Sequence, residues 1–349
     1  MNKYILKNNI DDKLIYYKSI KNNFIIFKNL WEQLYTTKNK IDYFKHWEYY
    51  KRKGNKYENI YTSNRNNICK KNPISRSYFK LCEILKDCDL FYKYKNILCM
   101  AEAPGGFIQY ISEMSLSDNI YGNTLISTSN KVPSWNYKIL NKYNIKYTHN
   151  LSNDGDLTNI NIINNIQNNI QRCELITADG GIDIMGDYNN QERDSFELIY
   201  SEIYLALICL GEGGSFILKI FDIFYLNTIQ LLYILGLCFE EIIFIKPKTS
   251  RSSNSEKYIV CKKYKTNKDI IASMLEFWDH KLNLNIKVSN HFIHDLFKYN
   301  ETFVKNQISN INYILNFNER NNNNNNNYKN KLKCIEWCKH YNMPINIHA

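Results

Sequence analysis

The feature that most constrains this 349-residue chain is an alternation of short apolar runs with helical segments, which begins near residue 96. The apolar runs have the length of strands. They are residues 96–101, 119–127, 174–181, 214–221, 241–247 and 257–264. Strands and helices that take turns are typical of a parallel sheet covered on both faces. The sequence therefore predicts a doubly wound α/β sheet.

The last two runs predict a different connection. Only a polar loop separates them, and it is too short for a crossover helix, so we expect an antiparallel hairpin at the end of the sheet. The hydrophobic stretch 223–239 is interrupted by Asn227, Thr228 and Gln230, which favours a buried helix over a membrane span. No secretory signal is apparent at residues 1–9, so we expect a cytoplasmic or nuclear protein, with a virion or a viral factory as further locations.

Helical extensions are predicted on both sides of the sheet. Residues 24–35 and 43–50 have apolar side chains at helical spacing, and we expect Trp31 and Trp47 to belong to a core. The predicted boundaries are a basic, aromatic-rich extension at 1–70, a central domain at 71–265 and a helical C-terminal extension at 266–349. Within the last, the asparagine run 321–327 is of low complexity and predicts a flexible loop.

The positive charge is concentrated at one end of the chain. Residues 1–100 contain 21 Lys and Arg against 9 Asp and Glu, a surplus of 21 − 9 = 12, whereas the remainder contains 24 and 25. The stretches 51–57 and 69–77 place cations near tyrosines, a mixture suited to binding phosphates and stacking bases. This indicates an RNA partner, and the alternative is a basic face that is merely solvated.

Cysteine usage indicates reduced thiols rather than a disulfide framework. The ten cysteines have no paired spacing. Cys334, Cys338 and His340 supply three potential zinc ligands without an obvious fourth, so we expect no metal site.

The first chemical motif is EAPGGF at 102–107, directly after an apolar strand. A strand that passes through Pro-Gly-Gly into a helix leaves a turn free of side chains, with helix N-terminal amides facing it. An adenosyl cofactor would fit there, although the turn could be purely structural. The pattern is not the GxGxxG fingerprint, so a nicotinamide cofactor is not favoured.

Charged residues recur at the ends of the predicted strands. Asp179 ends the strand in ITADGGID, Lys219 lies inside the apolar strand GGSFILKIFD, and Glu256 precedes the strand KYIV. Ligands of open α/β sheets bind beyond the carboxyl ends of the strands, where such residues would project. The alternative for Lys219 is an edge position that points to solvent.

With Lys80 in SRSYFKLCEI, these residues reveal a family. Their order, Lys80, Asp179, Lys219 and Glu256, resembles the Lys-Asp-Lys-Glu tetrad of RrmJ-type (FtsJ-like) RNA ribose 2′-O-methyltransferases, and APGGF is similar to the cofactor loop of that family. The resemblance covers roughly residues 70–265. It implies a Rossmann-like methyltransferase sheet, S-adenosylmethionine as methyl donor and RNA as substrate.

The resemblance also implies roles for individual residues. Lys219 would be the base that takes the proton of the 2′-hydroxyl, with its pKa lowered by the neighbouring Lys80. Asp179 would orient Lys219, and Glu256 would hold Lys80 or the ribose. The cofactor would be bound by Ala103, Pro104, Gly105, Gly106 and Phe107, with Asp156 and Asp179 as polar anchors. The second strand ends in Asn123 and Thr124 rather than an acid, so Glu102 is the alternative ribose ligand.

Several segments resemble the cap-specific branch of the family. KIFDIF, NDGDLTNI and KPKTSRSSNSEKYIVCK are similar to enzymes that methylate the first transcribed nucleotide. We therefore expect a cap-specific mRNA 2′-O-methyltransferase that binds capped RNA, with other capping or transcription subunits nearby. A ribosomal or transfer RNA methyltransferase and a non-catalytic RNA-binding subunit are the alternatives. Arg76 and Arg251 flank tetrad residues and could bind RNA phosphates, or could only pair with an acid.

Overall fold

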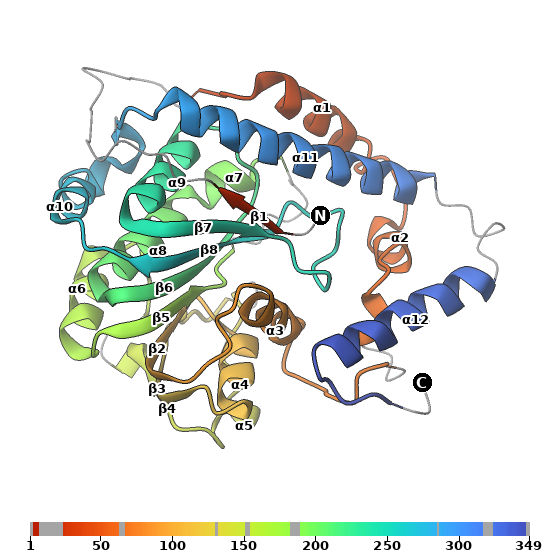
Figure 1. The fold of residues 1–349 in the computed structure, drawn as a ribbon, viewed down its shortest axis with the longest axis horizontal. Helices are drawn as coiled ribbons and strands as arrows, with labels where there is room; N and C mark the ends of the chain where they lie inside the picture. Colours follow the sequence, from red (N-terminus) through yellow and green to blue (C-terminus); the bar gives the residue numbers. More distant parts are fainter. Residues whose placement is uncertain are drawn as a thin grey trace.

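An eight-stranded mixed sheet forms the centre of the computed structural model (Figure 1). The structure describes residues 3–6, 24–62, 67–129, 132–150, 154–181, 189–284, 286–316 and 324–346. Within them the strand order is β1-β7-β8-β6-β5-β2-β3-β4. The strands are β1 (Lys3–Leu6), β2 (Tyr94–Met100), β3 (Ser117–Gly122), β4 (Ile145–Tyr147), β5 (Cys173–Ala178), β6 (Leu210–Ile220), β7 (Phe239–Ile245) and β8 (Lys257–Tyr264).

The sheet has a parallel half and an antiparallel half. Strands β4, β3, β2, β5 and β6 run parallel, whereas β8 is antiparallel to both β6 and β7. The predicted α/β sheet and its terminal hairpin are therefore confirmed. The hairpin is not the edge of the sheet, however, because β1 pairs with β7 beyond it.

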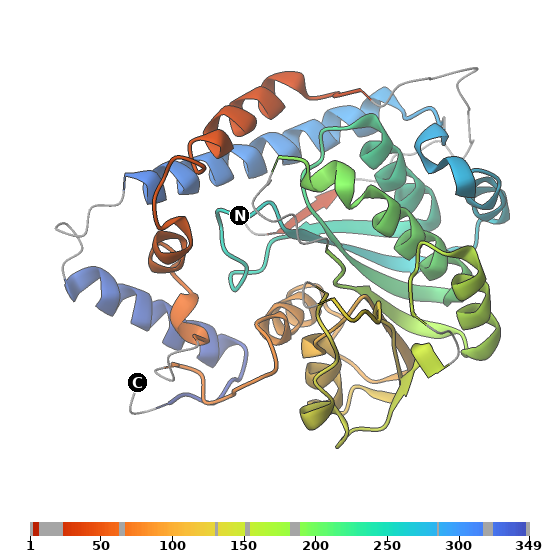
Figure 2. The same cartoon turned by 180° about the vertical axis from the view of Figure 1, so that it is seen from behind.

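Helices cover both faces of the sheet (Figures 1 and 2). The helices are α1 (Lys28–Asn39), α2 (Trp47–Lys53), α3 (Ser77–Asp87), α4 (Gly106–Glu113), α5 (Tyr137–Leu140), α6 (Ile160–Asn169), α7 (Gln191–Asp194), α8 (Phe196–Cys209), α9 (Leu226–Cys238), α10 (Lys268–Glu276), α11 (Asn290–Leu315) and α12 (Asn324–His340), with short 3₁₀ turns η1 (Glu58–Ile60), η2 (Thr148–Asn150) and η3 (Trp278–Asn283). One core contains residues of α1, α6, α8, α9 and α11, and the other contains residues of α3, α4 and α12.

Helix α9 is enclosed by protein, as predicted for residues 223–239. Nearly every one of its residues is buried, and Asn227 and Gln230 donate hydrogen bonds to the backbone oxygens of Leu282 and Ile286. These contacts satisfy the polar groups that interrupt the hydrophobic run. None of the helices in the described ranges combines the length and the apolar character that a bilayer crossing requires.

The N-terminal extension is joined to the sheet by more than helical packing. Helix α1 packs along α11, and Figure 2 shows the two lying side by side. Trp47 of α2 is buried, and Trp31 of α1 is partly buried and packs against the core, consistent with the expectation of a core role for both. From α1, Lys38 reaches Asp222 in a buried ion pair of 2.6 Å. This contact anchors the extension immediately beyond β6.

The C-terminal extension folds back onto the first half of the chain. Lys86 on α3 donates to the backbone oxygen of Tyr341, whose hydroxyl donates to Asp87. The asparagine run differs from the predicted loop, because α12 begins at Asn324; residues 321–323 lie outside the described residues. A helix is compatible with the run because Asn residues next to a packed helix can continue it despite their weak propensity.

All ten cysteines are buried and free. Within the described ranges no three His, Cys, Asp or Glu side chains are grouped to hold a metal.

Candidate active site

The parallel strands bring three chain segments to one edge of the sheet. Met100 at the end of β2 is in register with Ala178 at the end of β5, and Ala178 is in register with Leu218 of β6. The segments that follow β2 and β5 therefore begin side by side, next to the end of β6. Asp179 follows β5 directly, and Lys219 is the penultimate residue of β6.

The four predicted tetrad residues come together here as two ion pairs. Lys80 of α3 lies 2.8 Å from the Glu256 carboxylate, and Lys219 Nζ lies 3.3 Å from Asp179 Oδ1. Lys219 also donates to the backbone oxygen of Asp179 at 2.6 Å. All four side chains are between 12% and 15% exposed, so each can reach a ligand while most of it is shielded from water. The side chain of Lys219 therefore contacts Asp179 and does not point to solvent.

The charge state of Lys219 differs from the expectation. Burial alone would lower the pKa of Lys219, but Asp179, Glu256 and Glu202 act in the opposite direction and leave its pKa above the ordinary value. The predicted lowering of the Lys219 pKa by Lys80 was wrong, because the three acids outweigh burial. The acids around Lys219 therefore favour its charged form.

Glu256 carries the opposite charge. Its burial disfavours ionisation, but Lys80, Lys219 and Lys246 together hold the pKa of Glu256 well below its usual range. Ser250 adds a hydrogen bond of 2.8 Å to the same carboxylate. Glu256, in the polar loop before β8, is thus a negatively charged group held in place by its neighbours.

Three further residues support the tetrad and were missed by sequence reasoning. Tyr258 donates to Asp179 Oδ1 at 2.7 Å, and Lys246 donates to the backbone oxygens of Asn254 and Glu256. Glu202 of α8 is buried beneath Gly180, and its burial raises its pKa to about 8. Only Tyr258 had a usable signal, because residues two apart on a strand share a face and Glu256 precedes it by two.

A cavity of about 770 Å³ opens beside the tetrad. It is lined by segments that follow four strands, including Ala103 and Pro104 after β2, Asn123 and Thr124 after β3, Asp156 after β4, and Asp179 after β5. Lys80 and Lys219 also line it. The cavity therefore lies at the carboxyl edge of the parallel strands, where open α/β sheets bind ligands.

The two glycines of the turn, Gly105 and Gly106, do not line this cavity. Of the loop residues named from the sequence, Glu102, Gly105, Gly106 and Phe107 do not line the cavity. Phe107 lies in the first turn of α4 and is buried in the core. Gly106 has a steric role, because a Cβ there would lie 2.1 Å from Ser77 Oγ and 2.3 Å from Ser75 Oγ at the start of α3. The glycine thus allows α3, which carries Lys80, to approach the loop closely.

Glu102, the alternative ribose ligand, does not line the cavity. It is 2% exposed, and its Oε1 accepts a hydrogen bond of 2.5 Å from the amide of Phe107 in the first turn of α4. Asn123 lines the cavity instead, and its Oδ1 is buried without a hydrogen-bond partner among the described residues. A ribose hydroxyl would satisfy this acceptor. Together with Asp156, the residues present fit an adenosyl cofactor.

Arg76 and Arg251 each pair with the same acid. Arg251 makes a two-pronged contact with Glu58, at 2.7 and 3.1 Å, and Arg76 lies 3.5 Å from the same carboxylate. Arg76 also donates to the backbone oxygens of Tyr61 and Thr249. The alternative of an internal ion pair therefore describes both arginines, although Arg76 still borders the cavity. Glu58 lies in the extension, and nothing in its sequence context indicates this contact.

Comparisons with known proteins identify the family of this chain. Residues 73–264 match the model of the FtsJ-like methyltransferase family. A cap-specific mRNA (nucleoside-2′-O-)-methyltransferase of Autographa californica nuclear polyhedrosis virus is 31% identical over 242 residues, which cover 69% of this chain and 84% of the viral protein.

Other relatives are longer or more distant. Cap-specific mRNA (nucleoside-2′-O-)-methyltransferase 2 of Danio rerio is 33% identical over 213 residues, or 54% of this chain, and the match spans only 27% of that protein. A crystal structure described as a ribosomal RNA methyltransferase from Plasmodium falciparum has 21% sequence identity and a TM-score of 0.41, covering 55% of this chain and 99% of that one. From the family match and the viral relative, the chain belongs to the FtsJ-like methyltransferase family.

Proposed function

We propose that this protein is a cap-specific mRNA 2′-O-methyltransferase, which transfers a methyl group from S-adenosylmethionine to the 2′-hydroxyl of the first transcribed nucleotide. The observation that carries the proposal is the assembly of Lys80, Asp179, Lys219 and Glu256 as two ion pairs beside the large cavity. The name of the viral relative supports the choice of capped mRNA as substrate. The basic residues of 1–100 are suited to RNA phosphates.

The cavity residues would hold the methyl donor. Asn123 and Asp156 offer acceptors for its hydroxyl and amino groups, and Ala103 and Pro104 supply an unobstructed wall. When bound, S-adenosylmethionine supplies an electrophilic methyl group on a positively charged sulfur. Asp179 borders the same cavity and is the acid best placed to stabilise that charge.

The tetrad residues would remove the proton of the ribose 2′-hydroxyl. As the ribose oxygen forms its bond to the methyl carbon and the carbon–sulfur bond breaks, the hydroxyl proton must leave, and Lys219 Nζ is the proposed acceptor. Lys219 must first lose its own proton to solvent, because its acidic neighbours raise its pKa and favour the ammonium form. Lys80, fixed by Glu256, would stabilise negative charge that develops on the ribose oxygen.

The test measures transfer of labelled methyl groups to short RNAs that differ only in having a capped or a triphosphate 5′ end, followed by nuclease mapping. We expect label at the 2′-oxygen of the first nucleotide and only on capped RNA. Equal labelling of uncapped RNA, or label at internal positions, would assign the chain to ribosomal or transfer RNA instead. An absence of label on every RNA would leave a non-catalytic RNA-binding subunit. Such an enzyme would act in the cytoplasm or the nucleus, beside other capping or transcription subunits.

A further inference from the structure

One buried acid beside the large cavity takes no part in the two ion pairs of the tetrad. Glu202 of α8 is 1% exposed, and its Oε1 has no hydrogen-bond partner among the described residues. Leaving a buried polar atom unpaired is costly, so Oε1 points to an interaction with something that binds nearby.

Glu202 lies directly beneath the wall of the cavity. Gly180 and Leu198 both line the cavity, and Leu198 precedes Glu202 by four residues, on the same side of α8. A Cβ added to Gly180 would lie 2.3 Å from Glu202 Oε1 and 2.9 Å from Leu198 Cδ2. Because residue 180 has no side chain, the carboxylate comes within contact distance of the backbone that forms the wall.

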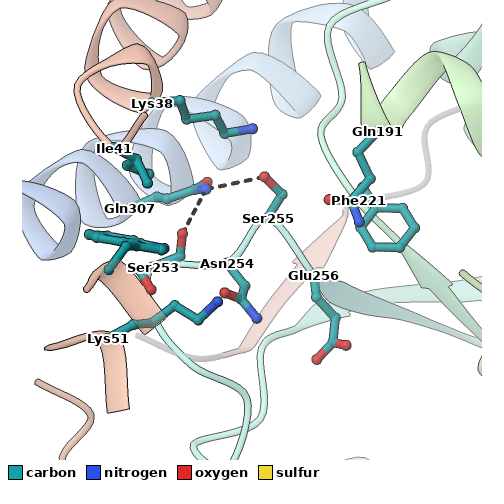
Figure 3. A pocket seen from close by; sticks show the side chains of 11 residues that line it. Lys38, Ile41, Lys51, Gln191, Phe221, Ser253, Asn254, Ser255, Glu256 and Gln307 are labelled. Atoms are coloured by element: carbon teal, nitrogen blue, oxygen red, sulfur yellow. Dashed lines mark hydrogen bonds between the residues drawn. The ribbon is translucent and has the colours of Figure 1, made fainter. Parts of the chain in front are cut away.

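The acids of the tetrad are already compensated by cations. Asp179 lies 3.3 Å from Lys219, and Glu256 lies 2.8 Å from Lys80. Figure 3 shows the Glu256 carboxylate turned away from Gln307, which leaves it to its lysine partner. In the described part of the chain, the acid of α8 has no such contact with a cation, so its charge is the one that can respond to a ligand in the cavity.

The groups around Glu202 favour its neutral form. Burial raises the pKa of Glu202 to about 8, Asp179 acts in the same direction, and Lys219 opposes both. These two charged side chains come from the end of β5 and from β6, the strands against which α8 packs. A positive charge brought into the cavity would favour the ionised carboxylate, whereas a neutral ligand would not.

The methyl donor and its product differ by such a charge. S-Adenosylmethionine has a positively charged sulfur, and once the methyl group has moved to the ribose oxygen the sulfur of S-adenosylhomocysteine is a neutral thioether. Resting on the function proposed above, we propose that Glu202 is a specificity-determining residue that makes the cavity prefer the charged methyl donor to its neutral product. The consequence is that inhibition by the product is weakest when Glu202 is ionised.

The experiment measures the Kd of each ligand by calorimetry at pH 7 and 9, with the full chain and without RNA. Both ligands have the same amino and carboxylate groups, so the titration of these groups cancels in the ratio of the two Kd values. We expect the Kd of the product divided by the Kd of the donor to rise about tenfold between pH 7 and 9, the effect of one nearby charge. Repeating the titration at pH 7 in buffers of different ionisation enthalpy should show that the donor releases a proton on binding and the product does not.

Glu202→Gln tests the residue, because it keeps the shape of the side chain and removes its charge. We expect the ratio of Kd values to become independent of pH, and Glu202→Ala should behave in the same way. The variants are needed because Glu102 is a second acid whose pKa is raised by burial and by Asp179. The matched control is Glu197→Gln, which removes the same charge from an exposed position of α8 and should retain the wild-type ratios.

Two results would overturn the inference and leave the proposed function in place. They are a wild-type ratio of Kd values that does not change with pH, or charge-free variants that keep the wild-type pH dependence, with methyl transfer to capped RNA intact in either case. The first result needs no variant, so it decides the matter even where a substitution at Glu202 prevents folding. A wild-type protein that does not bind S-adenosylmethionine would overturn the proposed function instead.

Discussion

Replacing Gly106 by alanine should disable the enzyme by moving helix α3. An added Cβ would lie 2.1 Å from Ser77 Oγ and 2.3 Å from Ser75 Oγ, distances that cannot be tolerated. Relief requires both hydroxyls to turn away, which breaks their mutual hydrogen bond of 2.5 Å, and the backbone nitrogen of Tyr78 would still be 3.1 Å away. We expect the variant to lose about 1–3 kcal/mol of unfolding free energy, as overpacked sites do.

The loss of activity should exceed the loss of stability. Lys80 lies one helical turn beyond Ser77, and its 2.8 Å contact with Glu256 depends on the start of α3. A displacement of about 1 Å at a reacting group can reduce the rate by about a hundredfold. The assay combines urea unfolding with single-turnover methyl transfer. Gly211→Ala is the control, since a Cβ there would meet nothing closer than 3.7 Å.

A rescue experiment tests the steric reasoning directly. In a Ser75→Ala/Ser77→Ala background the two clashing oxygens are absent, so adding Gly106→Ala should cost less than about 1 kcal/mol and less than about tenfold in rate. The same penalty in both backgrounds would refute the explanation, as would full activity of Gly106→Ala alone.

Three further predictions concern single side chains. Lys219→Ala should abolish methyl transfer and leave the Kd for S-adenosylmethionine nearly unchanged. Wild-type kcat should rise between pH 7 and 9, because acidic neighbours raise the pKa of the proposed base. Normal turnover by the variant, or a wild-type kcat that does not change with pH, would contradict this role. Asp156→Ala should weaken cofactor binding about tenfold by calorimetry, since this carboxylate lines the cavity; unchanged affinity would remove it as an anchor. Burial lowers the pKa of Lys246 to about 7, so between pH 7 and its ordinary value the unfolded chain binds more protons than the folded one, and the free energy of unfolding should rise with pH. Lys246→Met should lack this rise in urea unfolding at pH 7 and 9. An identical pH dependence in the variant would argue against a lowered pKa of Lys246.

The central sheet was predictable because its information is local. Strands β2, β3, β5 and β6 of the parallel half read as short apolar runs, and the alternation with helices limits the topology to a few choices. Two strands escaped prediction. β1 spans Lys3–Leu6 and β4 spans Ile145–Tyr147, both too short for a periodic signal, and each depends on a neighbouring strand that the local sequence does not indicate.

At the site, residues that carry a motif were predictable and their partners were not. Lys80 and Glu256 are 176 positions apart, yet their family pattern anticipated that they meet. The pairing of Arg76 and Arg251 with Glu58 has no such pattern, because it depends on where the extension packs. The same applies to the pKa of Lys219, whose direction is set by the sum of three acids, one of which, Glu202, comes from a helix without any motif.

Strand β1 has a consequence for how the protein is made. β1 ends at Leu6, but the strand it pairs with, β7, begins only at Phe239. During synthesis the first strand must therefore remain unpaired until β7 has left the ribosome. A nascent chain interrupted before β7 would hold β1 without its partner strand. Such an incomplete chain would need protection by chaperones.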